Sequence, residues 1–101
     1  MHISIDGHGR VGMTDAAEFT AFDIHAVDPS VESVLGALGS DGWPSPEADH
    51  VFVTIDAVRR LAGDEVDEAW QTSFDAMLAY AGSKGWLDEA RTAIKAHIES
   101  V

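Results

Sequence analysis

Apolar residues recur every three or four positions along the last third of the chain. Between positions 64 and 84 they are Val66, Trp70, Phe74, Met77, Leu78 and Ala81. Acidic and amide side chains fall on the opposite side, so the pattern predicts an amphipathic helix with one apolar face. Asp64 is placed to cap its first turn, and Gly85 can adopt the left-handed conformation that ends a helix.

The same spacing continues from position 86 to position 101. The stripe there consists of Leu87, Ala90, Ile94, His97, Ile98 and Val101. Asp88 and Glu89 would lie in the first turn of this second helix, where negative charge complements the helix dipole. We therefore expect two antiparallel helices joined at 84–86. Neither can bury its apolar stripe without the other helix and a third surface.

The patterns before position 64 are shorter and of both kinds. The predicted elements are a β-hairpin (1–13), a strand (19–27), a helix (29–38), a loop (39–49), a central strand (50–55) and a brief helix (56–63). The strands rest on alternation and on β-branched and aromatic residues, and the loop on its Gly, Ser, Asp and Pro content.

This order of elements predicts a single α+β domain over residues 1–101. We expect a small sheet of three to four strands, made of the hairpin and two longer strands. An antiparallel helical hairpin at the C-terminal end, together with shorter helices, would cover one face of it. The strand–helix–loop–strand segment at 19–55 is long enough for a right-handed parallel crossover, and 56–101 would form the helical part.

Charge narrows the classes of partner. Six Lys and Arg stand against eighteen Asp and Glu, which gives a formal net charge of −12. Such a chain repels phosphate backbones and anionic lipid surfaces, so we expect neither nucleic acid nor a membrane as a partner. The acidity suits either solubility alone or docking on a basic protein. The chain has no cysteine, no secretion signal and no long apolar stretch, so the expected location is the cytoplasm.

One glycine pattern formally matches a nucleotide-binding motif. Residues 7–12 read G-x-G-x-x-G, and Asp28 follows at the distance of a ribose-binding acid. However, the motif requires a helix after its last glycine, and residues 13–18 provide little more than one turn. The glycines are better explained by a hairpin turn with positive φ angles, and no cofactor is predicted.

Three polar residues of the strand segments could carry chemistry. Asp23 and His25 are two apart on a predicted strand and so point the same way, and His50 begins a strand that could lie alongside. Such a group would suit a metal site, or an acid/base pair in which the carboxylate orients the imidazole. The alternative is that Asp23 and His25 simply face water on a half-exposed sheet. No metal ligand set is assigned from these residues.

The other histidines have simpler interpretations. His97 lies on or beside the stripe of the last predicted helix, either as a buried general base facing a pocket or, more typically, as a packed residue bonded to a carbonyl. His2 and His8 belong to the hairpin and are expected at the surface. Signatures of hydrolases, P-loop proteins and zinc proteases are absent.

Aromatic residues form the second unusual set. Trp70 and Trp86, with Tyr80, fit the core of the predicted helical hairpin and its edge. Trp43 lies in a polar loop where no periodicity directs it inward. It could cover a ligand pocket or anchor a partner, or it could close the end of the core. Trp43, Trp86 and Tyr80 are therefore the candidate residues for binding a ligand or a partner.

Two functions from different classes follow. The first is a small acidic accessory or binding protein that acts through contacts with another protein or with a second copy of itself, as a homodimer. The second is a small enzyme, cofactor-free or metal-assisted, of isomerase or hydrolase type, which transfers a proton through His25 with Asp23 as its orienting partner and His50 or His97 nearby. A small-molecule ligand is compatible with either function.

Overall fold

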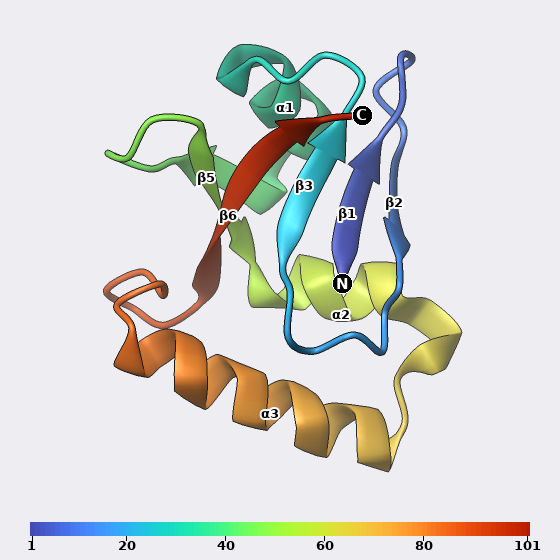
Figure 1. The fold of residues 1–101 in the computed structure, drawn as a ribbon, viewed down its shortest axis with the longest axis vertical. Helices are drawn as coiled ribbons and strands as arrows, with labels where there is room; N and C mark the ends of the chain where they lie inside the picture. Colours follow the sequence, from blue (N-terminus) through green and yellow to red (C-terminus); the bar gives the residue numbers. More distant parts are fainter.

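The computed structural model describes residues 1–101 and contains one six-stranded mixed sheet with three α-helices (Figure 1). The strands are β1 (His2–Ile5), β2 (Val11–Thr14), β3 (Asp23–Ala26), β4 (Gly42–Pro44), β5 (His50–Thr54) and β6 (Ala93–Ser100). The α-helices are α1 (Val31–Leu38), α2 (Ile55–Ala62) and α3 (Glu68–Ser83), and the short 3-10 turns η1 (Gly39–Asp41) and η2 (Gly63–Glu65) follow α1 and α2. The class is α+β, as the order of sequence patterns predicted.

The strands lie in the order β2-β1-β3-β6-β5-β4. The parallel pairs are β1 with β3 and β3 with β6, and all other neighbours are antiparallel. The last strand of the chain thus occupies the middle of the sheet. It joins the N-terminal half, β2-β1-β3, to the pair β5-β4 (Figure 1).

The N-terminal hairpin forms where the alternation predicted it, with β1 antiparallel to β2. Its turn is held by the carboxylate of Asp6, which accepts hydrogen bonds from the backbone N–H groups of His8 and Arg10 at 2.8 and 2.9 Å. These bonds, that from Arg10 most of all, lower the pKa of Asp6. Gly9 has a φ of 77°, a conformation that glycine adopts without strain.

The two faces of the sheet differ in cover. Side chains on one face, such as Ile3, Ile24 and Val51, are fully buried against Val34 of α1 and Val58 of α2. The residues that alternate with them are partly or fully exposed, and no helix lies in front of β1, β3 and β6 in Figure 1. We call this second side the open face.

Helix α3 crosses one end of the sheet, below the start of β1 and the β2–β3 connection (Figure 1). Trp70, Phe74 and Ala81 are its buried residues, spaced at four and seven as an amphipathic helix requires. The indole N–H of Trp70 donates to the carbonyl of Ala16 at 2.8 Å, which ties the helix to the β2–β3 connection. Asp67, not Asp64, caps it by accepting from the N–H of Trp70.

No helix of this chain combines the length and apolar character needed to cross a lipid bilayer.

The prediction of a second C-terminal helix is wrong. Residues 93–100 form β6, so the sheet has six strands and not three to four, and no helical hairpin covers it. Ile94, Ala96 and Ile98 are buried, and the residues between them are not, which is a strand period of two. A spacing of four, as between 94 and 98, belongs to both periods. The segment forms a strand because it pairs with β3 on one side and with β5 on the other.

Two further expectations about the sheet are corrected. The strands at 19–27 and 50–55 are not joined by a parallel crossover, because β6 lies between β3 and β5, parallel to the first and antiparallel to the second. The predicted loop at 39–49 contains β4, an edge strand paired with β5. A three-residue strand with a proline is too short to leave a sequence pattern.

Candidate functional site

Two regions of the molecule carry functional candidates, and the first is a line of histidines and carboxylates across the open face. The strand register places His2 opposite Asp23, Asp23 opposite His97, and His97 opposite His50. One residue row further along, His25 lies opposite Glu99. We call these residues the histidine row: His2, Asp23, His25, His97, Glu99 and His50.

One half of the histidine row is closely connected. Oδ1 of Asp23 lies 2.5 Å from Nδ1 of His2 and 3.2 Å from Nε2 of His25. The same Nε2 of His25 lies 3.2 Å from Oε2 of Glu99. The rings of His2 and His25 stack with centroids 4.6 Å apart and an interplanar angle of 21°. Two imidazoles therefore converge on one carboxylate.

The other half is looser. The rings of His50 and His97 lie 4.9 Å apart, and Nε2 of His50 is 2.9 Å from Oε2 of Glu47. Nδ1 of His50 is bonded to the carbonyl of Ala48 at 2.7 Å. His97 is exposed on β6, so neither a packed histidine nor a buried base on a helix is present there.

The chain terminus lies beside the histidine row. The amino group of Met1 donates to the carbonyl of Glu18 at 2.8 Å, and the Met1 side chain is fully buried. Burial lowers the pKa of this amino group, although the carboxylates of Glu18, Asp23 and Asp15 act in the opposite direction. Met1 is thereby fixed in place, and with it His2, the first residue of β1.

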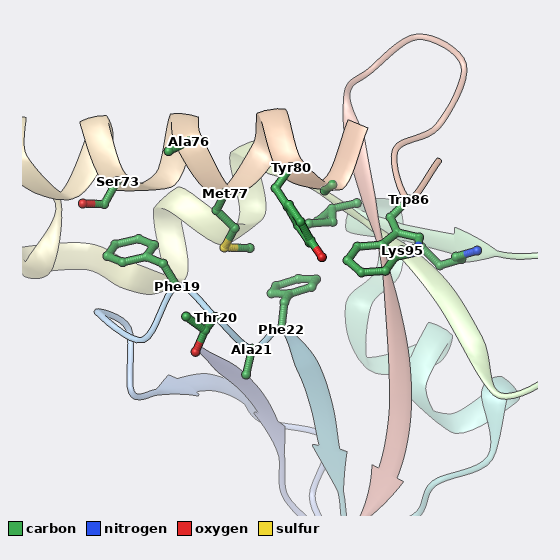
Figure 2. Close-up of a pocket in the computed structure, with 12 residues that line it drawn as sticks. Phe19, Thr20, Ala21, Phe22, Ser73, Ala76, Met77, Tyr80, Trp86 and Lys95 are labelled. Carbon is green, nitrogen blue, oxygen red and sulfur yellow. The ribbon is translucent and has the colours of Figure 1, made fainter. Parts of the chain in front are cut away.

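The second region is an apolar cavity of about 590 Å³ between α3 and the β2–β3 connection, which we call the aromatic pocket (Figure 2). Nine of its twelve lining residues are hydrophobic. In Figure 2, Met77 and Tyr80 of α3 point toward Phe22, Phe19 stands at one end, and Trp86 and Lys95 stand at the other. No histidine lines it.

The end of α3 sets the position of Trp86. Gly85 has a φ of 77°, the N–H of Gly85 donates to the carbonyl of Gly82, and that of Trp86 donates to the carbonyl of Ala81. This pair of hydrogen bonds is a Schellman motif, which reverses the chain at the helix end. It brings Trp86 edge-to-face with Tyr80 at 5.8 Å between ring centroids.

Both rim aromatics are accessible. Tyr80 is 57% exposed and Trp86 is 41% exposed, and they are the only aromatic residues among the exposed large hydrophobics. Lys95 reaches the same end of the pocket, while its ammonium group lies 3.4 Å from a carboxylate oxygen of Glu47. Lys95 thus connects the pocket to the edge of the open face.

The residues proposed from the sequence fall into these two regions in an uneven way. Asp23, His25, His50 and His97 all lie on the open face, and Tyr80 and Trp86 line the pocket. Trp43 joins neither site, because it lies in β4 with its ring 6.2 Å from that of Phe52. The acid/base pair therefore has its carboxylate–imidazole contact, but the aromatic pocket is not beside it. His25 lines a separate, more polar hollow of about 380 Å³.

Two sets of residues were missed. His2 was taken as a surface residue of the hairpin, although alternation placed it on the polar side of its strand. Its contact with Asp23 depends on the parallel pairing of β1 with β3, which no local pattern encodes. Phe19, Phe22 and Met77 of the pocket were assigned to a strand and a helix. The meeting of those two segments at the sheet end was not foreseen.

Comparison with known proteins adds no identification: no family model matches the chain, and neither the curated proteins nor the solved structures contain a significant match.

Proposed function

We propose that this chain is an accessory or binding protein that recognises a partner protein through the aromatic pocket. The observation that carries the proposal is that the two exposed aromatic side chains, Tyr80 and Trp86, stand on the rim of the aromatic pocket. Interface hot spots are enriched in Trp and Tyr and lie around pockets that accept an apolar anchor. The cavity volume falls within the range of about 300–1,000 Å³ that is typical of binding sites.

The expected energetics fit an anchored protein contact. Burying one Leu- or Phe-sized side chain of a partner contributes about 1.5–3 kcal/mol, and a favourable aromatic contact adds about 0.5–1.5 kcal/mol. Association costs at least about 4 kcal/mol in lost translational and rotational freedom. The anchor alone is therefore insufficient, and contacts around the rim must supply the remainder.

Charge selects the kind of partner. At the pocket, the ammonium group of Lys84 lies 5.5 Å from the Tyr80 ring centroid, and that of Lys95 is paired with Glu47. The surface as a whole carries a net charge of −12. A segment with an apolar anchor flanked by Lys or Arg is consequently favoured, since electrostatic attraction raises its association rate. A second copy of the chain is disfavoured by the same charge.

We propose that such a partner is met in the cytoplasm, the location expected for a cysteine-free chain. The enzyme alternative has less support, because the hollow of about 380 Å³ that His25 lines contains neither Trp43 nor a second histidine of the open face.

The test is selection of peptides from a random phage-displayed library on the immobilised protein. We expect enriched peptides that combine a large apolar residue with flanking Lys or Arg. A synthetic peptide of the enriched sequence is then titrated by fluorescence anisotropy. Trp86→Ala should weaken its binding about 30-fold, the effect of losing one hot spot of about 2 kcal/mol. Trp43→Ala is the matched control and should leave binding nearly unchanged.

Three outcomes would overturn the proposal. Enriched peptides without an apolar residue, or binding that Trp43→Ala weakens and Trp86→Ala does not, would place recognition elsewhere. Binding of the dye anilinonaphthalene sulfonate, lost in Trp86→Ala, with no peptide enriched, would make the pocket a small-molecule site. Sedimentation of a dimer that Trp86→Ala dissociates would make a second copy of the chain the occupant, and not a basic partner.

A further inference from the structure

The geometry points to a site for a divalent transition-metal ion on the open face, held by His2, Asp23 and His25. This inference is independent of the proposed partner binding, because none of the three residues lines the aromatic pocket. It begins from strand geometry. His2 and Asp23 are directly opposed on parallel strands, and His25 is two residues beyond Asp23 on the same side. Three potential ligands therefore project from two hydrogen-bonded strands.

The donor atoms are close enough to share one ion. One donor atom from each of the three residues lies within 4.8 Å of the other two. Ligand atoms at about 2.0–2.1 Å from a tetrahedral Zn²⁺ are about 3.4 Å from one another, by simple geometry. The present separations from Oδ1 of Asp23 are 2.5 Å to His2 and 3.2 Å to His25. Small side-chain rotations, without backbone movement, would open the space for the ion.

The donor types indicate the class of ion. Two imidazoles and one carboxylate suit zinc, and also iron, cobalt or nickel in the divalent state, whereas magnesium and calcium prefer oxygen ligands. Oε2 of Glu99 lies 3.2 Å from Nε2 of His25, but Glu99 is not part of the group whose donor atoms all lie within 4.8 Å of one another. The fourth position therefore remains for water.

The hydrogen-bond arithmetic of the cluster also favours a cation. A neutral imidazole has one N–H, yet His2 faces Asp23 through Nδ1 and Asp15 through Nε2, the latter at 3.6 Å. Nε2 of His25 faces two carboxylates at once, those of Asp23 and Glu99. Acceptors therefore outnumber donors. With Nδ1 of His2 on a metal, its Nε2–H would point toward Asp15, the outer carboxylate that commonly orients a ligating histidine.

The test uses a protein in which Met1 keeps a free amino group, because its side chain is fully buried and this amino group donates to the carbonyl of Glu18. The protein is produced with a cleavable C-terminal tag that contains no histidine after removal. Zn²⁺ is titrated into it by calorimetry, with Mg²⁺ and Ca²⁺ as controls. We expect one equivalent of Zn²⁺ to bind and neither control ion to compete.

Variants separate this site from general binding to surface histidines. Asp23→Asn and His25→Gln should each weaken Zn²⁺ binding more than about 100-fold, since loss of an outer partner alone costs about 10- to 100-fold. His50→Gln is the matched control, because His50 also contacts a carboxylate but has no second imidazole on it. Its affinity for Zn²⁺ should stay unchanged.

A second measurement does not depend on how the variants fold. In the unaltered protein, the ring nitrogens of His2 and His25 should shift in two-dimensional NMR on addition of Zn²⁺, and those of His8 should not. Bound Co²⁺ should show the visible absorption bands of a four- or five-coordinate ion. Absence of saturable Zn²⁺ and Co²⁺ binding would overturn the inference. Binding that His50→Gln abolishes while His25→Gln retains it would overturn it equally.

Discussion

The open face and the aromatic pocket share strand β6 but are built in opposite ways. On the open face, polar residues alternate with buried ones, and their imidazoles and carboxylates are already in contact with one another. In the pocket, apolar side chains from α3 and from 19–22 approach without closing over the space between them. The first region has imidazoles and carboxylates at short distances, and the second has apolar area that no residue of the chain covers.

This difference determines what each region can recognise. Burial of apolar area is not directional, so the pocket can accept anchors of several shapes and gains free energy mainly from displaced water. An ion on the open face must meet donor atoms at fixed distances and angles, so that site is selective for the kind of ion. Substitutions in the two regions should therefore differ in how much they change the stability of the protein and how much they change its binding.

The largest effect is expected where α3 meets the core, because the pocket exists only while this helix is docked. Phe74 is fully buried, and its ring lies 4.7 Å from that of Trp70. Phe74→Ala should lower the free energy of unfolding by about 3–5 kcal/mol, as truncation of a buried Phe does. Urea denaturation measures it. Met77→Ala, on the half-buried pocket wall, should cost clearly less, and equal costs would mean that the wall is part of the core.

The turn into β6 provides the next effect, which depends on pH. The carboxylate of Asp88 accepts from the N–H groups of Thr92 and Ala93 at 2.7 and 2.9 Å. Desolvation alone would raise the pKa of Asp88, but these hydrogen bonds outweigh it and the pKa falls below its ordinary value of 3.8. Asp88→Ala should cost about 1–2 kcal/mol at neutral pH.

The sign of the pH dependence follows from the lowered pKa. The stabilisation by the Asp88 carboxylate is fully present above its unfolded pKa and is lost as the pH falls through the folded value. The difference between the unaltered protein and Asp88→Ala should therefore shrink below about pH 4, in urea titrations at a series of pH values. A difference that grows on acidification would contradict this account. Glu89→Ala, in the same turn, is the control.

The strand at 93–100 shows why the fold was only partly predictable from sequence. Its Ala, Lys and Glu residues favour a helix locally, and its apolar positions fit both periods. The alternation of Ile94, Ala96 and Ile98 with polar residues was nevertheless a usable signal. What the local pattern lacks is the gap between β3 and β5 that this segment fills, and tertiary pairing overrides propensity there.

The candidate site was predictable to a similar extent. A period of two places Asp23 and His25 on one side of any strand, so their common direction followed from sequence alone. The arrival of His2 beside them needs the parallel pairing of β1 with β3, two strands separated by a hairpin. Tyr80 and Trp86 are candidates from sequence because of their residue type. The pocket that they border needed the fold.

A smaller effect is expected at the rim of the pocket. The backbone of Gly85 is left-handed, and no atom lies within 4 Å of the position that a Cβ would take. Gly85→Ala should therefore cost only the backbone strain, about 1 kcal/mol, without a clash. Gly85→Asn should cost less, because Asn tolerates this conformation. Thermal denaturation compares the two. Equal costs would mean that the helix end rearranges, and a shifted Trp emission in Gly85→Ala would show that Trp86 moves with it.

The smallest effect is expected on the open face itself. His50 and Glu47 form a partly exposed pair, and pairs of this kind contribute about 0–1 kcal/mol because water competes for both groups. His50→Gln should therefore change the free energy of unfolding by no more than about 0.5 kcal/mol, the usual range for surface substitutions. Urea denaturation curves of the unaltered protein and of His50→Gln should nearly superimpose. A loss above about 1 kcal/mol would mean that the histidine row is a cooperative stabilising network. In that case its imidazole–carboxylate contacts would serve to hold the sheet together, and the contrast with the aromatic pocket would be one of stability and not of recognition.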